Sequence, residues 1–131
     1  MTGEVATILV VDDEETIRES LQFYLEARGF DVATAASAEQ ALELLARHPC
    51  DAAIVDIRLP GQSGDTMILA AQPRFPAMKW LICTGSMEFG LGPELLAAGL
   101  TPRDVFTKPI ADMGLLVDRL QQLLPAKGPW A

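Results

Sequence analysis

The amino-acid sequence predicts an α/β fold in which helices cover both faces of a doubly wound parallel sheet. Five short apolar runs alternate with five helix-like segments, and such alternation is typical of consecutive βαβ units. Half of the residues are hydrophobic and 21% are charged, which favours a compact core. At 131 residues, one domain is expected. The predicted strands cover residues 7–11, 30–35, 52–55, 79–83 and 104–107.

The first two helices have recognisable start and stop signals. Asp13 is the expected N-cap of the first helix, and Gly29 is its expected C-terminal stop. Ser37 and Gln40 have the spacing of a capping box at the start of the second helix. That helix is expected to end at Pro49.

The other three helices are marked by prolines, glycines and apolar spacing. The third is expected to begin near Gly64 and to end before Pro73. The fourth is short, with Pro93 at its first helical position. The last, at residues 112–124, has an apolar stripe from which Leu115 is displaced.

Composition and charge exclude several classes of protein. A net charge of −8 and a pI near 4.5 argue against direct nucleic-acid binding by this chain, which would need clustered Lys and Arg. No apolar stretch approaches the roughly 18 residues of a membrane span, and no basic region of a signal peptide begins the chain. Cys50 and Cys83 are expected to be reduced and buried. We therefore expect a cytoplasmic protein without a membrane segment.

Charged residues directly follow three of the predicted strands. Asp12 and Asp13 follow the first, Asp56 the third, and Lys108 the fifth. If the strands are parallel, three carboxylates and one ammonium gather at the carboxyl edge of the sheet, where open α/β sheets bind ligands. The sequence therefore predicts a functional site at that edge.

Four motifs at strand ends resemble the receiver domain of two-component response regulators, the fold of the chemotaxis response regulator. They are Val10-Val11-Asp12-Asp13, Asp56 with Pro60 and Gly64, Thr84-Gly85, and Lys108-Pro109. The resemblance covers nearly the whole chain, with residues 5–124 as the receiver domain and residues 125–131 as a short tail or linker. It implies a flavodoxin-like, five-stranded parallel sheet in the order 2-1-3-4-5.

The resemblance also implies a magnesium site. Asp56 is implied to be the phosphoacceptor and a metal ligand, Asp13 a direct ligand, and Asp12 a ligand directly or through water. The backbone carbonyl of Arg58 is implied to complete the ligands that the protein supplies. Carboxylate oxygens suit Mg²⁺, which usually binds few carboxylates and several waters.

Phosphoryl transfer explains why these groups would occur together. A carboxylate that attacks a phosphoryl donor approaches another anion, so Mg²⁺ and an ammonium must offset the negative charge. The resemblance implies that Lys108 supplies this ammonium and that Thr84 donates its hydroxyl to the phosphoryl group. It implies a switch, not a turnover enzyme, that receives the phosphoryl group from a histidine kinase or phosphotransfer protein. An output domain, an effector protein or a weak homodimer partner is also compatible with it.

Each site residue has a structural explanation when it is considered alone. Asp12 and Asp13 could cap a helix, and Asp56 could form a turn. Thr84 could bond to nearby backbone, and Lys108 could be a solvated surface charge. Their joint placement favours a functional site, because independent structural uses would not all collect at one sheet edge.

The sequence departs from the receiver pattern at several positions. Receivers commonly have Tyr or Phe three residues before the lysine, but Val105 stands there, and Phe106 is expected on the opposite face of the sheet. Gly85 replaces a frequent Ala, and Arg58 and Ser86 occupy positions that influence hydrolysis of the phosphoryl group in the family.

Two other functions are compatible with parts of this pattern. The first is a degenerate receiver that binds partners without phosphorylation, which the missing aromatic residue at Val105 favours. The second is an Asp-nucleophile phosphatase of the haloacid dehalogenase type. That chemistry requires an acid two residues after the nucleophile, where this chain has Arg58.

Overall fold

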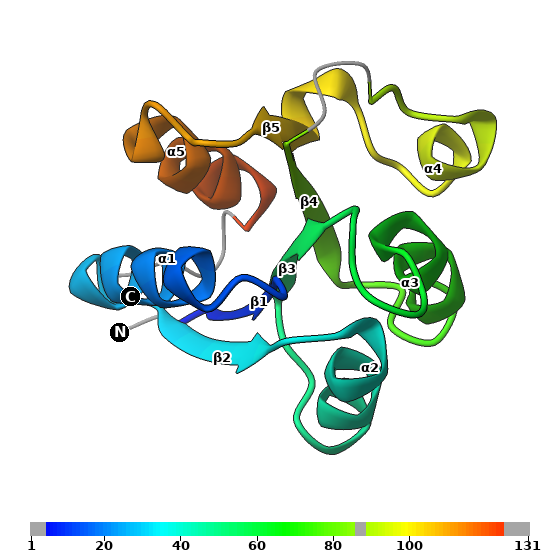
Figure 1. Ribbon diagram of the computed structural model, residues 1–131, viewed down its shortest axis with the longest axis horizontal. Helices are drawn as coiled ribbons and strands as arrows, with labels where there is room; N and C mark the ends of the chain where they lie inside the picture. Colours follow the sequence, from blue (N-terminus) through cyan, green and yellow to red (C-terminus); the bar gives the residue numbers. More distant parts are fainter. Residues whose placement is uncertain (1–4, 86–88, 125–131) are drawn as a thin grey trace.

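The computed structural model describes residues 5–85 and 89–124, so the predicted tail at residues 125–131 lies outside the described residues. The domain is built on a five-stranded parallel sheet in the order β2-β1-β3-β4-β5 (Figure 1). This confirms the predicted fold class and strand order. The strands are β1 (Thr7–Val11), β2 (Asp31–Ala35), β3 (Ala52–Asp56), β4 (Lys79–Thr84) and β5 (Val105–Thr107).

Helices in the described part of the chain cover both faces of this sheet. One face carries α1 (Glu15–Ala27) and α5 (Met113–Leu123), and the other carries α2 (Ala38–Arg47), α3 (Gly64–Ala71) and α4 (Pro93–Ala97) (Figure 1). A 3₁₀ turn (Pro102–Asp104) precedes β5. Because every strand is parallel, the loops that follow them emerge at the same edge of the sheet.

Two apolar cores fill the space between the sheet and its helices. In β1, Ile8 and Val10 pack on the α1 and α5 side, whereas Leu9 and Val11 pack on the opposite side. The central strand β3 is buried along its whole length. Burial on both faces explains why these strands read as continuous apolar runs.

The predicted Ser37 cap and Gly29 stop are confirmed, but the capping box is only half formed. The Ser37 side chain accepts a hydrogen bond from the Gln40 N–H at 3.1 Å, whereas the Gln40 side chain accepts one from the Ala36 N–H at 2.7 Å instead of from the Ser37 N–H. After α1, Gly29 has a φ of 90°, a conformation in which a residue with a Cβ would be strained.

Three strand boundaries differ from the prediction by one residue: β2 begins at Asp31, β3 ends at Asp56 and β4 ends at Thr84. Two further boundaries are wrong for an identifiable reason. The N-cap of α1 is Glu14, not Asp13, because the Asp12 side chain accepts a hydrogen bond from the Glu14 N–H at 2.9 Å and delays the helix by one residue. The last strand begins at Val105, one residue after the predicted start. Asp104 belongs instead to the 3₁₀ turn, where its carboxylate accepts a hydrogen bond from the Thr101 N–H at 2.8 Å.

The predictions about the two cysteines and about the β5 side chains are confirmed. Cys50 and Cys83 are buried free thiols, as predicted. Val105 and Phe106 pack against opposite faces of the sheet, as strand alternation requires. Ser86 lies outside the described residues. Among the helices that the structure describes, none is long and apolar enough to cross a membrane.

Candidate functional site

The carboxyl ends of four strands bring the predicted site residues to one edge of the sheet. The pairing of Val11 with Val55 aligns the ends of β1 and β3. The pairings of Asp56 with Cys83 and of Thr84 with Thr107 continue this alignment through β4 and β5. Residues that follow these strands therefore share one edge although they are far apart in the sequence.

Three carboxylates converge at this edge. One oxygen from each of Asp12, Asp13 and Asp56 lies within 4.8 Å of the others. Asp12 and Asp56 are buried, with 1% and 4% exposure, whereas Asp13 is exposed. Asp13 and Asp56 line a cavity of about 390 Å³. A set of hard oxygen donors at an open cavity fits Mg²⁺, which keeps several of its waters when it binds.

Lys108 provides the positive charge of this site. Its Nζ lies 2.7 Å from Asp12 Oδ2, 3.0 Å from Asp56 Oδ2 and 3.4 Å from Glu14 Oε1. Partial burial lowers the pKa of Lys108, but its hydrogen bonds to Asp12 and Asp56 outweigh that effect and raise it above the usual value. Lys108 therefore stays protonated between the two buried carboxylates.

Asp56 experiences opposing influences. Burial raises the pKa of its carboxyl group, and the hydrogen bond and charge of Lys108 lower it without cancelling the effect of burial. The negative charge of Asp12 raises it further. Its Oδ1 also accepts a hydrogen bond from the Arg58 N–H at 3.2 Å. The negative charge of Asp56 is thus less stable here than in water.

The loop after β3 is packed tightly over the Asp56 backbone. The Gly64 N–H donates to the Ile57 carbonyl at 2.9 Å, which folds the loop back onto the strand end. A Cβ on Gly64 would overlap with the backbone oxygen of Asp56 and would lie 2.9 Å from Val55 Cγ1. Only glycine therefore permits this approach between the start of α3 and the end of β3.

Thr84 closes the β4 side of the site. Its side chain belongs to the buried end of β4, where the residue is 1% exposed, and its carbonyl accepts a hydrogen bond from the Lys108 N–H at 2.8 Å. This bond couples the backbone of Thr84 to that of Lys108. Gly85, the next residue, lines the same cavity as Asp56 and Lys108.

Two residues of this site were not identified from the sequence. Glu14 belongs to none of the four strand-end motifs, but it lies against Lys108 and lines the cavity. Arg18 belongs to none of them either, yet its Nη1 donates a hydrogen bond to the Asp12 carbonyl at 2.7 Å. The available signal was position, because Glu14 directly follows Asp13 and Arg18 is the fourth residue of the helix that begins after it.

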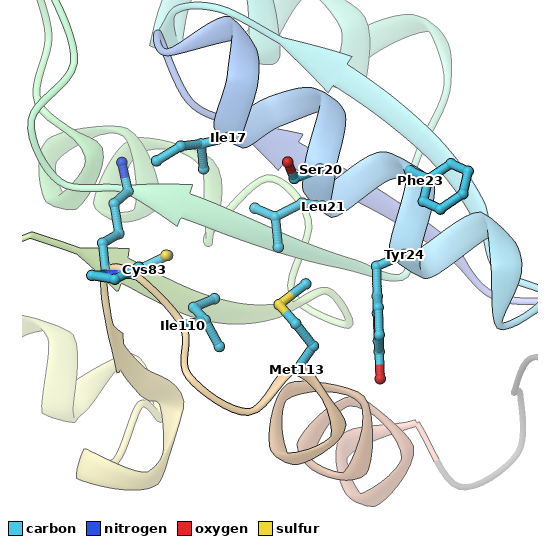
Figure 2. A pocket seen from close by; sticks show the side chains of 10 residues that line it. Ile17, Ser20, Leu21, Phe23, Tyr24, Cys83, Ile110 and Met113 are labelled. Atoms are coloured by element: carbon cyan, nitrogen blue, oxygen red, sulfur yellow. The ribbon is translucent and has the colours of Figure 1, made fainter.

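An apolar cavity of about 430 Å³ lies beside Lys108, between α1 and the segment that leads into α5. Figure 2 shows Leu21 of α1 on one side of it and Ile110 and Met113 on the other. Burial raises the pKa of Cys83, which also lines the cavity, to about 12. Its thiol is therefore protonated at neutral pH and is a poor nucleophile.

The sequence is similar to a known family and to curated relatives. The family model of the response regulator receiver domain matches residues 8–121. The response regulator protein PilR of Pseudomonas aeruginosa is 35% identical over 123 residues, which cover 94% of this chain and 27% of PilR. The alginate biosynthesis transcriptional regulatory protein AlgB of the same organism is 33% identical, over 88% of this chain and 25% of AlgB. The chain thus spans about a quarter of the length of these relatives.

Solved structures agree with this similarity. A CheY-like response regulator receiver domain protein from Methanospirillum hungatei has a TM-score of 0.80 and 29% identity, with 94% of this chain and 97% of that chain covered. The response regulator protein TrrA from Thermotoga maritima, solved in complex with Mg²⁺ and BeF, has a TM-score of 0.80 and 28% identity, with 92% and 100% covered. Together with the family match and the clustered acids of the sheet edge, these likenesses show that the chain belongs to the response regulator receiver domain family.

Proposed function

We propose that Asp56 is the phosphoacceptor of this receiver domain. The observation that carries the proposal is the combination of Lys108 Nζ at 3.0 Å from Asp56 Oδ2 with two further carboxylates in the same cluster. An ammonium and a divalent cation are the groups that offset negative charge when a carboxylate attacks a phosphoryl donor.

The reaction is a displacement at phosphorus. An Asp56 carboxylate oxygen forms the new P–O bond while the P–N bond of a phosphohistidine breaks, and the departing imidazole keeps the electron pair of that bond. Bound Mg²⁺ supplies positive charge to the phosphoryl oxygens. Lys108, which lines the cavity, binds one of these oxygens, and Thr84, at the end of β4 next to the cavity-lining Gly85, donates its hydroxyl to another.

We assign the metal site to Asp12, Asp13, Asp56 and the Arg58 backbone carbonyl. The convergence of the three carboxylates supports this assignment, because the single ammonium of Lys108 offsets only part of their negative charge and a divalent cation would offset the rest. The structure of TrrA with Mg²⁺ and BeF is consistent with the same chemistry in a relative.

The partners follow from the proposed chemistry. The phosphoryl donor is a histidine kinase or a phosphotransfer protein, and an output domain or effector protein reads the result, in a cytoplasmic pathway. Full-length relatives such as PilR and AlgB are named as regulators and are about four times as long as the matched region. The output of this chain is therefore proposed to depend on residues or proteins beyond the receiver domain.

Intact-mass measurement tests the acceptor assignment. Acetyl phosphate with Mg²⁺ should add one phosphoryl group to the wild-type chain, and Asp56→Asn should abolish the addition. Asp118→Asn, at an exposed position on α5, is the matched control and should be labelled like the wild type. Full labelling of the Asp56 variant would move the acceptor to another residue, and no labelling of the wild type would favour a degenerate receiver.

A further inference from the structure

We propose that Arg18 is a positioning residue, which holds the Asp12–Asp13 backbone in the orientation that Mg²⁺ coordination requires. Arg18 is the fourth residue of α1, and its guanidinium reaches back to the loop before the helix. There, Nη1 donates a hydrogen bond to the Asp12 carbonyl at 2.7 Å. This inference rests on the proposed function, because it concerns the metal site of that reaction.

The Asp12 carbonyl needs a donor because it lies beyond the end of a β ladder. The pairing of β1 with β2 ends at Val11 and Ala35, and the Asp12 N–H still donates to the Ala35 carbonyl at 3.1 Å. If this parallel ladder continued, the next donor to the Asp12 carbonyl would be the Ser37 N–H, but β2 ends at Ala35 and Ser37 is the N-cap of α2. Asp12 is buried, and an unpaired buried carbonyl is costly. The Arg18 guanidinium supplies the donor that β2 no longer offers.

Asp13 depends on this contact more than Asp12 does. Asp12 is fixed through its own carboxylate, which accepts hydrogen bonds from the Glu14 N–H and binds Lys108. In the described part of the chain, no hydrogen bond or ion pair holds the exposed Asp13 carboxylate. Its direction is therefore set by the two peptide groups that flank Asp13. Arg18 holds the one before it, and the Asp12 side chain holds the one after it.

The charge of Arg18 has the opposite effect on a cation. A guanidinium beside the metal site repels Mg²⁺, so a role limited to charge predicts tighter binding after its removal. A positioning role predicts weaker binding, because groups that orient metal ligands typically contribute about 10–100-fold to affinity. The sign of the change therefore separates the two roles.

The test is a Mg²⁺ titration of the full chain, followed by backbone amide chemical shifts. Arg18→Met should weaken Mg²⁺ binding about tenfold. Arg18→Lys keeps the charge but loses the planar fork, and it should weaken binding about threefold. The matched control is Arg28→Met on the same helix, where the guanidinium donates to the Tyr24 hydroxyl at 2.6 Å. This control should leave the Mg²⁺ affinity within about twofold of the wild type.

A second readout does not need the metal. In Mg²⁺-free protein, Arg18→Met should shift the amide signals of Asp13 and Glu14, and Arg28→Met should not. Unchanged or tighter Mg²⁺ binding by Arg18→Met would overturn the proposal. If that variant does not fold, Arg18→Lys decides, and an affinity equal to that of the wild type overturns it.

The outcome is distinguishable from failure of the proposed function. A wild-type chain that binds Mg²⁺ but takes no phosphoryl group from acetyl phosphate would overturn Asp56 as acceptor, and the Arg18 comparison would still decide the positioning role. A wild-type chain that binds no Mg²⁺ would overturn both. Weaker Mg²⁺ binding in the Arg18 variants, with normal labelling at saturating Mg²⁺, would support both.

Discussion

Two halves of the site are packed differently: an acidic half, formed by Asp12, Asp56 and the loop to Gly64, and a threonine half, formed by Thr84 and Gly85. In the acidic half, a Cβ on Gly64 would overlap with the Asp56 backbone, and Lys108 binds both buried carboxylates. In the threonine half, a Cβ on Gly85 would meet nothing within 4 Å among the residues that the structure describes. The comparison indicates that the carboxylates of the proposed metal site are held by close contacts, whereas Gly85, beside Thr84, has open space where a side chain would lie, as far as the described residues show.

Alanine substitutions at Gly64 and Gly85 should show the largest difference between the two halves, measured as a change in the free energy of unfolding. Gly64→Ala should lower the free energy of unfolding by about 3 kcal/mol, because its clash is with backbone that cannot move without displacing Asp56. Gly85→Ala should change it by less than about 0.5 kcal/mol. Urea unfolding of both variants measures the difference. Equal losses would show that the two halves are packed alike.

Substitution of Asp13, the exposed member of the proposed metal site, should have the next largest effect. Asp13→Asn removes one of three converging negative charges and should weaken Mg²⁺ binding by more than about tenfold. Glu15→Gln is the control, since Glu15 is an exposed acid two residues away that is not in the cluster. Titration of Mg²⁺ into each variant gives the affinities. Similar losses in both would mean that general negative charge, not coordination, attracts the cation.

Neutralisation of Asp56 should stabilise the metal-free protein. Burial raises the pKa of Asp56 despite the opposing effect of Lys108, so the ionised form is less favourable in the folded state than in the unfolded state. At pH 7, Asp56→Asn should therefore raise the free energy of unfolding by about 1 kcal/mol.

The pH dependence of the difference in unfolding free energy between Asp56→Asn and the wild type is the control for this prediction. As the pH falls through the raised pKa of folded Asp56, the wild-type carboxyl group becomes neutral and the advantage of the variant should disappear. Urea unfolding in EDTA at neutral and acidic pH measures both values. Destabilisation by Asp56→Asn at pH 7 would mean that the ion pair with Lys108 outweighs the cost of burial.

The smallest effect concerns how the signal leaves the site. Val105 has no ring that could move between buried and exposed positions, so the response to beryllofluoride and Mg²⁺ should pass through Thr84 into the following segment. Amide exchange should change over residues 89–100 more than over residues 52–60. Exchange that is unchanged over residues 89–100 but altered on α1 would show that the signal leaves by the opposite face.

The sequence was sufficient to predict the fold and the end of each strand to within one residue. Apolar runs in parallel strands have few alternatives, and Asp12, Asp56 and Lys108 follow such runs directly. Once the strands are aligned, these side chains must lie at one edge. The prediction therefore depended on strand ends, which short-range patterns identify well.

Contacts that depend on the packing of a helix or on competing caps could not be predicted. Arg18 meets Asp12 only because α1 leaves the sheet in a particular direction, which sequence spacing does not specify. The N-cap was misassigned because the side chain of Asp12 binds the Glu14 N–H, and either of two adjacent aspartates could have done so. β5 begins one residue later than predicted because the cap formed by Thr101 and Asp104 competes with strand pairing.

The contacts of Lys108 imply that Mg²⁺ binding at the proposed site would be an exchange of one cation, the Lys108 ammonium, for another. The ammonium already serves as an internal counter-ion for Asp12 and Asp56, so a Mg²⁺ ion at the proposed site would compete with it for these carboxylates. Lys108→Ala should consequently bind Mg²⁺ more tightly than the wild type while accepting phosphoryl groups poorly. Under the proposed function, Mg²⁺ at these carboxylates would leave the Lys108 ammonium free to pair with an incoming phosphoryl group.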